Sequence, residues 1–449
     1  MQGFRRDSFT RFRIFPQAPF LHPGRPPELV TISTPCGLIG PGPSDHRLYV
    51  ANPVGKRAPY GIATGPYGTP HLTLPPWRGP ILPPVQPGAD GHFDHIAPGT
   101  QEFLEAHSFA IIRFVMDVWE RYFGRPICFH FARDYGRLEV LMLPSFDNAH
   151  CGYGFMEVGA DHRDDGRLVP FALNFDVVAH EFGHLIIYGT VGIPAHPAEA
   201  SEYFGFQESA ADTTAMIAAL HFESLIEDVL AESRGNLYSY NELNRFAELA
   251  RNEQIRLASN AVKLSAFADG WDDEHDLSQP LTGAIFDILV DIFQENLVAR
   301  GLVSRAAADL SDRVAQRPEL AAIVQSMFDE AYPGQEDGFR AALIETRDYL
   351  GTALAMTWER LSPDGLDYAA VARTLLAVEE AMSDGRYGEE MRESFAWREI
   401  GQVRAGPRRA KPDTSSHAFS ARTVLPEMGR ALPKMTYRER FLTARGRAR

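Results

Sequence analysis

The sequence predicts an α+β fold with two lobes, a mixed α/β lobe containing a sheet and then a mainly helical lobe, with a histidine-bearing helix between them. Three observations predict it. Residues 98–192 combine a long helical pattern with two apolar runs typical of strands. From about residue 207 the chain is a series of helical patterns separated by turn residues. Between these parts, a His-Glu-x-x-His motif lies within 176–186.

Composition limits the classes of protein that this chain can be. It has 449 residues, 45% of them hydrophobic, which is enough for two or three structural units with a sizeable core. The formal net charge of −15 argues against nucleic acid as the main partner. The charge is uneven, because residues 401–449 carry 12 Lys and Arg against 3 Asp and Glu. We expect 401–449 to be a basic, loosely ordered tail.

The sequence also suggests where the protein is found. Its first eight residues lead into no apolar segment, so no signal peptide is expected. No uncharged apolar run of about 18 residues occurs, so no membrane span is expected. Cys36, Cys128 and Cys151 are widely spaced, which fits a reducing compartment better than a disulfide framework. We therefore expect a cytoplasmic protein, and nothing in the sequence indicates its oligomeric state.

Residues 1–97 are rich in proline and glycine, which excludes long helices there. Short apolar pieces at 29–32 and 47–50 predict brief strands. We expect this N-terminal extension to wrap a larger body and not to form a domain of its own.

The expected α/β lobe, residues 98–192, begins with a helix that Thr100 can cap and that runs to about Phe123. Two strands of one sheet are expected next, at 127–131 and 138–143. The histidine-bearing helix completes this lobe.

The following residues, 193–400, are expected to form the mainly helical lobe. Their helical patterns show no internal repeat. The expected helices lie near 207–230, 240–262, 280–299, 304–315, 318–331, 336–350 and 366–383.

The motif His180-Glu181-x-x-His184 has the spacing of a zinc site. Two histidines four residues apart lie on one face of a helix, so both imidazoles can bind one zinc ion. Glu181, one position further round the helix, can reach a water bound to that ion. The alternative is an amphipathic core helix with two partly buried histidines.

A catalytic zinc ion needs a third protein ligand beside two histidines. We favour Glu208, because Asp212 follows one turn later, where it can accept a hydrogen bond from the outer nitrogen of a ligand histidine. Glu199 and Glu202 are rival ligands in the same connection. Alternatively, Glu208 and Asp212 belong to a helix start where acidic residues complement the helix dipole.

His180-Glu181-x-x-His184 followed by Glu208-x-x-x-Asp212 resembles the thermolysin-like gluzincin zinc metallopeptidases. The resemblance implies their two-lobed fold and one zinc ion per chain, bound by His180, His184 and Glu208. It also implies Glu181 as general base and Asp212 as the hydrogen-bond partner of His180.

Two further segments extend the resemblance, which covers roughly residues 98–300. Asn148-Ala149 resembles the edge-strand segment with which the family pairs the substrate backbone, which implies substrate binding by Asn148 and Ala149. Met156 to Asp161 and the acidic loop after them continue the likeness.

Downstream, Asp272 to Ser278 resembles the family's Asp…His-x-x-Ser element, which implies that His275 stabilises the oxyanion. The alternative is a surface-loop histidine beside carboxylates. Tyr203 and Tyr188 are candidates for the family's oxyanion tyrosine. Calcium is not predicted, because the family's calcium carboxylates do not line up beyond Asp176.

These features together predict a zinc-dependent peptidase, more specifically an endopeptidase, that acts on a peptide or protein. Zinc-activated water would attack the peptide carbonyl while Glu181 accepts its proton. One alternative is a zinc hydrolase of non-peptide amides or an aminopeptidase. Another is a non-catalytic zinc protein on the same scaffold, which the intact Glu181 argues against, since a binding module needs no general base.

Overall fold

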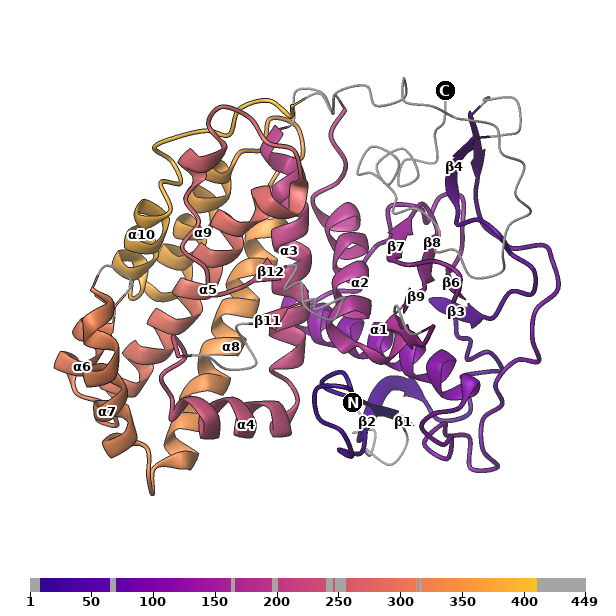
Figure 1. Cartoon of the computed structure of the whole chain (residues 1–449), viewed down its shortest axis with the longest axis horizontal. Helices are drawn as coiled ribbons and strands as arrows, with labels where there is room; N and C mark the ends of the chain where they lie inside the picture. Colours follow the sequence, from indigo (N-terminus) through magenta and orange to yellow (C-terminus); the bar gives the residue numbers. More distant parts are fainter. Residues whose placement is uncertain are drawn as a thin grey trace. The chain divides into compact units, whose positions relative to one another are not determined.

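The computed structural model divides the chain into two compact units (Figure 1). One unit comprises the described residues up to Val118 and Ile127–Gly189, and the other comprises Trp119–Pro126 and the described residues of Thr190–Arg409. The fold is α+β, as predicted, with a small sheet in the N-terminal part and a mainly helical remainder. The described residues are 9–64, 70–162, 166–195, 201–239, 245–246, 256–311, 313–314 and 317–409.

The first unit contains a four-stranded sheet with the strand order β3-β6-β8-β7. These strands are β3 (Leu48–Ala51), β6 (Leu138–Met142), β8 (Phe155–Val158) and β7 (Ala149–Gly152). The strands β3, β6 and β8 are parallel, whereas β7 runs antiparallel to β8 at the edge. Every residue of β6, β7 and β8 is buried, which explains the apolar run that predicts β6.

The Pro/Gly-rich N-terminal segment adds further strands to this unit. An antiparallel pair is formed by β1 (Phe9–Ile14) and β2 (Glu28–Pro35), and another by β4 (Gly61–Thr64) and β5 (Pro70–Thr73). The two brief strands expected in this segment are found as β2 and β3. Because β3 pairs with β6, the segment contributes to the main sheet itself.

Helix α1 (Gln101–Phe123) agrees with the prediction at both ends. Its cap is Thr100, whose Oγ1 accepts a hydrogen bond from the Phe103 N–H at 3.2 Å. Its end is marked by Gly124, whose φ of +65° an L-residue with a side chain rarely adopts. The last residues of α1, from Trp119, belong to the second unit.

Of the two strands expected after α1, only the second exists, as β6. The segment 127–131 is wrong as a strand, because the chain turns there: the Ala132 N–H bonds to Phe129 O and the Asp134 N–H to Phe131 O. The side chains of Phe129 and Phe131 are nevertheless buried. The apolar alternation in this segment therefore records side-chain burial without strand pairing.

The histidine-bearing helix is α2 (Phe175–Thr190), which follows the short antiparallel pair β9 (Ala160–His162) and β10 (Leu168–Pro170). The Asp176 N–H at the start of α2 bonds to Asn174 Oδ1 at 3.0 Å. Near its end, a Cβ on Gly189 would lie 2.1 Å from the Cys128 carbonyl oxygen. Only glycine allows the chain to approach the helix so closely there.

The second unit is mainly helical in its described part. Helix α3 (Ser201–Ala219) packs along α5 (Glu274–Ala299). None of the described helices is long and apolar enough to cross a membrane. The other helices are α4 (Glu223–Ser233), α6 (Arg305–Ser311), α7 (Ala321–Ala331), α8 (Glu336–Trp358), α9 (Tyr368–Ser383) and α10 (Gly388–Trp397), with the 3₁₀ turns η5 (Leu264–Phe267) and η6 (Pro318–Leu320).

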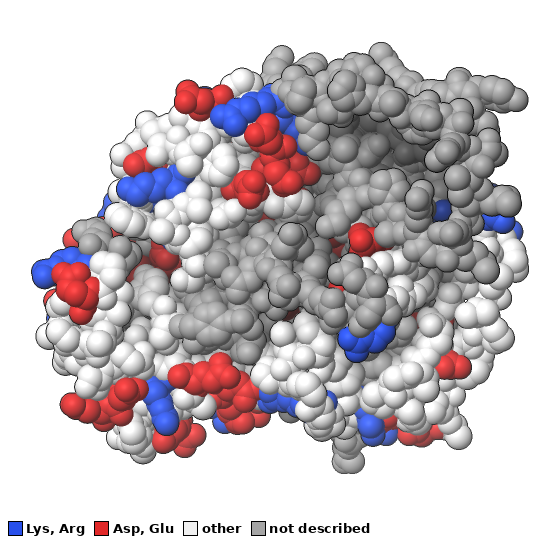
Figure 2. Space-filling model, in the orientation of Figure 1, with Lys and Arg blue, Asp and Glu red and all other residues white. Residues whose placement is uncertain are grey.

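Acidic and basic side chains lie next to each other at several places on the described surface in Figure 2. The second unit contains several ion pairs between partly exposed side chains. They join Arg300 to Glu345, Arg305 to Glu295 and Arg340 to Glu223.

Most of the expected helices of the second unit are confirmed. Those expected near 280–299, 304–315, 318–331, 336–350 and 366–383 are found as α5 to α9, with boundaries shifted by several residues in some cases. The largest shift is at the end of α8, which continues to Trp358, and the next is at the start of α5, which begins at Glu274 because Asp273 caps it. Helix α10 was not predicted, since Met391 and Phe395 are the only large apolar side chains it buries.

Two expected helices need correction. The single helix near 207–230 is two, because a turn at 220–222 separates α3 from α4. The helix near 240–262 is wrong for its described residues, where β11 (Arg245–Phe246) pairs with β12 (Arg256–Leu257). After β12, the Val262 N–H bonds to the Asn260 side chain, a local turn that competes with a helix. The remaining residues of that prediction lie outside the described part.

The first residues of the expected basic tail, 401–409, are ordered against the second unit, contrary to expectation. The Ala405 N–H bonds to Glu202 Oε1 at 2.7 Å, and the Gly406 N–H bonds to Phe267 O at 2.8 Å. Composition missed this because part of the contact is made by main-chain groups, whose hydrogen bonding residue type does not reveal. Residues 410–449 lie outside the described part.

Candidate active site

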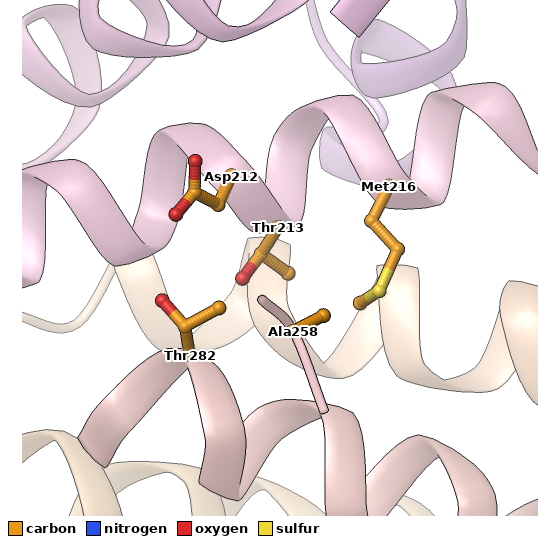
Figure 3. Close-up of a pocket in the computed structure, with 5 residues that line it drawn as sticks. All are labelled: Asp212, Thr213, Met216, Ala258 and Thr282. Atoms are coloured by element: carbon orange, nitrogen blue, oxygen red, sulfur yellow. The ribbon is translucent and has the colours of Figure 1, made fainter. Parts of the chain in front are cut away.

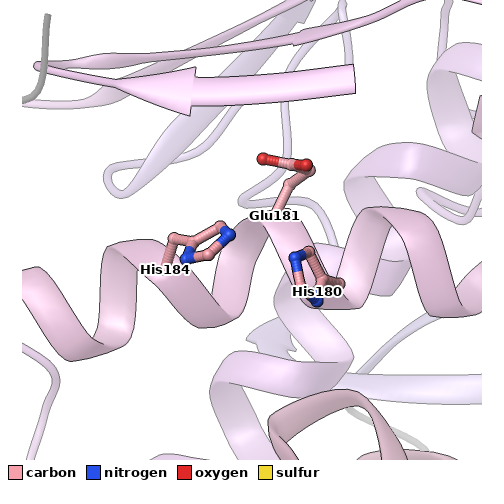
Figure 4. Close-up of side chains that lie close together, drawn as sticks. All are labelled: His180, Glu181 and His184. Carbon is pink, nitrogen blue, oxygen red and sulfur yellow. The ribbon is translucent and has the colours of Figure 1, made fainter. Parts of the chain in front are cut away.

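His180, Glu181 and His184 lie together on α2 (Figure 4), as their spacing predicts. One possible ligand atom from each lies within 4.8 Å of the others, a grouping that could hold a metal ion. The three residues are 3%, 5% and 4% exposed. The two imidazole centroids are 4.6 Å apart with ring planes at 87°, so the rings meet edge to face and are not stacked.

The chemistry of this group fits a zinc ion. Two imidazoles with an adjacent carboxylate are a donor set that zinc prefers over calcium or magnesium. The Oε2 of Glu181 is buried and makes no hydrogen bond to any described residue. A buried carboxylate oxygen is costly without a partner, and a bound water or cation would supply one.

Asn148 and Ala149, predicted to bind substrate, lie at the edge of the sheet in the same unit. Ala149 begins the edge strand β7, and Asn148 directly precedes it. The Asn148 carbonyl accepts a hydrogen bond from the Gly159 N–H at 3.0 Å. A Cβ on Gly159 would lie 1.8 Å from the Phe146 carbonyl oxygen, so a glycine is required where this chain crosses.

In the first unit, a series of ring-to-ring contacts begins at His184. The ring of Tyr188, a candidate for the oxyanion tyrosine, lies 6.3 Å from that of His184 with the planes at 24°. His130 follows at 5.1 Å from Tyr188, and Tyr153 at 5.5 Å from His130. Tyr188 is thus next to the histidine pair on the same helix.

In the second unit the structure brings together Glu208 and His275. Glu208 lies on α3 and is fully buried, and its Oε2 is 3.3 Å from His275 Nε2. Asp212 follows one turn later on α3 and is also buried. The sequence predicted a role for each residue but not the contact between Glu208 and His275.

Asp273 is a functional candidate that the sequence interpretation gave no role. Its Oδ1 accepts hydrogen bonds from both the main-chain N–H and the Nδ1 of His275, each at 2.8 Å. The hydrogen bond from the imidazole lowers the pKa of Asp273 to about 2. The signal in the sequence was an aspartate at the capping position of α5.

Tyr203 is placed where it cannot serve an oxyanion directly. It is fully buried, and its hydroxyl donates to the Gly192 carbonyl at 2.6 Å. The same hydroxyl accepts a hydrogen bond from Gln207 Nε2 at 2.9 Å. A phenol has one proton, and here a main-chain carbonyl takes it.

Of the two rival zinc ligands, Glu202 and Glu199, only Glu202 lies in the described part of the chain, and its contacts differ from those of Glu208. Glu202 bridges two main-chain N–H groups, with Oε1 bonded to Ala405 at 2.7 Å and Oε2 to Tyr368 at 2.6 Å. These bonds give Glu202 a structural role in its own unit. Glu199 lies outside the described residues.

A small cavity lies beside Asp212 in the second unit (Figure 3). It has room for about one water molecule, and its lining includes Asp212 and Thr213 from α3 and Thr282 from α5. The Thr282 hydroxyl is buried and has no hydrogen-bond partner among the described residues. A water in this cavity would give it one. Met216 and Ala258 complete the lining.

No protein-family model and no curated protein sequence matches this chain. Among solved structures, the precursor of protealysin, a metalloproteinase from Serratia proteamaculans, is similar with a TM-score of 0.40 and 12% sequence identity. The similarity covers 74% of this chain and 84% of that one.

Proposed function

We propose that this chain is a zinc-dependent peptidase, and that it cleaves within peptides and proteins. The observation that carries the proposal is the buried group His180, Glu181 and His184 on one face of α2. In this proposal His180, His184 and Glu208 hold the ion. A zinc ion bound here would make a water nucleophilic near neutral pH and polarise the substrate carbonyl.

Glu181 is the proposed general base. It lies beside both histidines, and its Oε2 is buried without a hydrogen bond to any described residue, so it is available to accept a proton. It would take that proton from the attacking water and pass it to the leaving amine. A binding site needs no proton acceptor, so the presence of Glu181 beside the two histidines favours catalysis over a non-catalytic role.

His275 is proposed to stabilise the oxyanion, with Asp273 holding its Nδ1 side. The support is the hydrogen bond by which Asp273 holds Nδ1 of His275 at 2.8 Å, because it leaves Nε2, which lies 3.3 Å from Glu208, as the nitrogen that would donate to an oxyanion once Glu208 binds the ion. A donor held in place before the reaction stabilises developing charge without reorganising. Asp212, one turn after Glu208, is the proposed hydrogen-bond partner of His180.

The edge strand β7 is the proposed docking place for the substrate backbone. An edge strand offers main-chain N–H and C=O groups to an added strand, so an extended peptide can pair with Ala149 and its neighbours. Pairing along an edge strand binds several consecutive residues of an extended peptide and does not depend on a chain end, which favours an endopeptidase.

The experiment is a cleavage profile of a complex peptide library, read by mass spectrometry, for the wild type and Glu181→Gln. Glu223→Gln makes the same chemical change at a 77%-exposed side chain and serves as the control. Metal analysis of all three proteins checks that zinc is bound. Cuts made by the wild type and the control but not by Glu181→Gln support the proposal. Identical profiles with zinc bound would reject it in favour of a non-peptide amide or a binding role.

A further inference from the structure

A short segment near the end of the described chain, residues 405–409, lies along the loop that leads into α5. We call it the strap; it follows α10 at the yellow end of the chain in Figure 1. The main chain of the strap both donates a hydrogen bond to the loop and accepts one from it. The Trp271 N–H bonds to Pro407 O at 3.3 Å, and the Arg409 N–H bonds to Trp271 O at 2.8 Å. The strap therefore satisfies both main-chain groups of Trp271.

The side chains of the strap bind the same loop. The Arg408 guanidinium lies 5.2 Å from the ring centroid of Trp271, and its Nη2 is 3.4 Å from Glu274 Oε2. The Arg409 Nη1 is 3.3 Å from Asp272 Oδ2. These two carboxylates stand on either side of the residue that caps α5.

Glycines make this close approach possible from both sides. A Cβ on Gly406 of the strap would lie 2.5 Å from the Ala268 carbonyl oxygen. A Cβ on Gly270 of the loop, where φ is +115°, would lie 2.7 Å from the Pro407 carbonyl oxygen. A chance surface contact would not need a glycine in each partner.

The strap also contacts α3. The Ala405 N–H bonds to Oε1 of Glu202, whose other oxygen holds the Tyr368 N–H. Glu202 is on the helix that carries Glu208, and the loop leads to His275. The strap thus touches both elements whose side chains meet at the 3.3 Å contact between Glu208 and His275.

We propose that the strap is a positioning element, which holds the loop into α5 so that the His275 imidazole stays against Glu208. This role rests on the proposed function, since it affects turnover only if His275 and Glu208 take part in it. The mechanical link is Asp273, which holds Nδ1 of His275 and lies between the two carboxylates that the strap's arginines bind. Displacing the loop displaces Asp273 and the imidazole together.

The first test is hydrogen exchange by mass spectrometry on peptides covering 268–276, in the full chain. In Arg408→Gln/Arg409→Gln we expect exchange there to become about five- to tenfold faster, because partly exposed ion pairs restrain a loop by a small free energy. Gly406→Ala, which keeps every charge, should have the same effect by pushing the strap away. Arg404→Gln is the matched control, because Arg404 directly precedes the strap but pairs with Asp367, the cap of α9.

The second test is steady-state cleavage of a peptide that the wild type cuts. We expect kcat of Arg408→Gln/Arg409→Gln to fall about three- to tenfold with KM nearly unchanged, as for the loss of a contact that matters in the transition state. Arg408→Lys/Arg409→Lys keeps both charges and should recover most of kcat. Arg404→Gln should leave both constants unchanged.

The possible outcomes distinguish a failure of the strap proposal from a failure of the proposed function. Unchanged exchange at 268–276 in both strap variants would overturn the holding role. Faster exchange with unchanged kcat would overturn the positioning role and leave the strap a structural feature. If the wild type cuts no more than Glu181→Gln, the proposed function fails and the positioning role with it, while the exchange data still decide whether the strap holds the loop.

Discussion

His107 is a buried histidine on α1 that should make the first unit lose stability in mild acid. It is fully buried, and its Nε2 accepts the Phe15 N–H at 2.8 Å. The proton of the neutral ring is therefore on Nδ1, which lies 2.6 Å from the Ala172 carbonyl just before α2. Burial lowers the pKa of His107 from 6.5 to about 4. A second proton on Nε2 would face the Phe15 N–H.

The sign and size of the effect follow from these two pKa values. Between pH 6.5 and about 4, the unfolded chain binds a proton at His107 that the folded chain does not. The stabilisation that comes from neutral His107 is therefore complete above the pKa of this residue in the unfolded chain. It falls as the pH falls towards the pKa of His107 in the folded chain. A gap of about 2.5 pKa units corresponds to about 3 kcal/mol in the free energy of unfolding.

The assay is urea unfolding of the wild type and His107→Gln at several pH values from about 7.5 to 4. Other groups titrate in this range too, so the quantity to follow is the difference between the two proteins. We expect this difference to shrink by about 3 kcal/mol as the pH falls, because the glutamine takes up no proton. His46→Gln, at an exposed histidine, should track the wild type. A difference that stays constant over the whole range would refute the reasoning.

Three further predictions concern stability. Gly189→Ala should cost the first unit about 2 kcal/mol in denaturant unfolding, because the new Cβ would lie 2.1 Å from Cys128 O; an unchanged midpoint would contradict this close contact. Arg398→Met should cost the second unit about 3 to 5 kcal/mol, since burial raises the pKa of Asp287 to about 6 even with Arg398 bonded to it at 2.8 Å. Arg398→Met/Asp287→Leu should recover most of that loss, and no recovery would argue against the ion pair as the cause. A chelator should lower the melting temperature reversibly in the wild type but not in His180→Ala, and an equal shift in both would count against the site.

The cluster on α2 was predictable because the residue spacing by which the motif is identified is also what places its side chains together on a helix. The spacing of His180 and His184 identifies the motif, and the same spacing puts both side chains on one helix face whatever the rest of the fold does. Thr100 at the start of α1 is a similar case, since a cap depends on the main chain a few residues away. Such features need no knowledge of long-range contacts.

The errors arose where distant parts of the chain decide the structure. Apolar alternation predicted β6 correctly, and it predicted a strand at 127–131 incorrectly, because alternation reports burial while a strand also needs a partner with free main-chain groups. Glu157 shows the same limit. It is fully buried in β8, which is possible because Lys56 lies 3.0 Å away and His150 lies 2.6 Å away. Nothing in the Pro/Gly-rich composition around Lys56 predicts that partner.

The two groups of candidate residues, one in each unit, therefore depend on the sequence in different ways. The donors on α2 are fixed by helical geometry, so a substitution among them removes chemistry and leaves the helix in place. The contact between His275 and Glu208 depends on a cap at Asp273, and through that loop on main-chain pairing with a segment more than a hundred residues later. A substitution in that distant segment leaves all the reactive groups present and changes only where one of them points. It should lower kcat without abolishing turnover, whereas loss of Glu181 should abolish it.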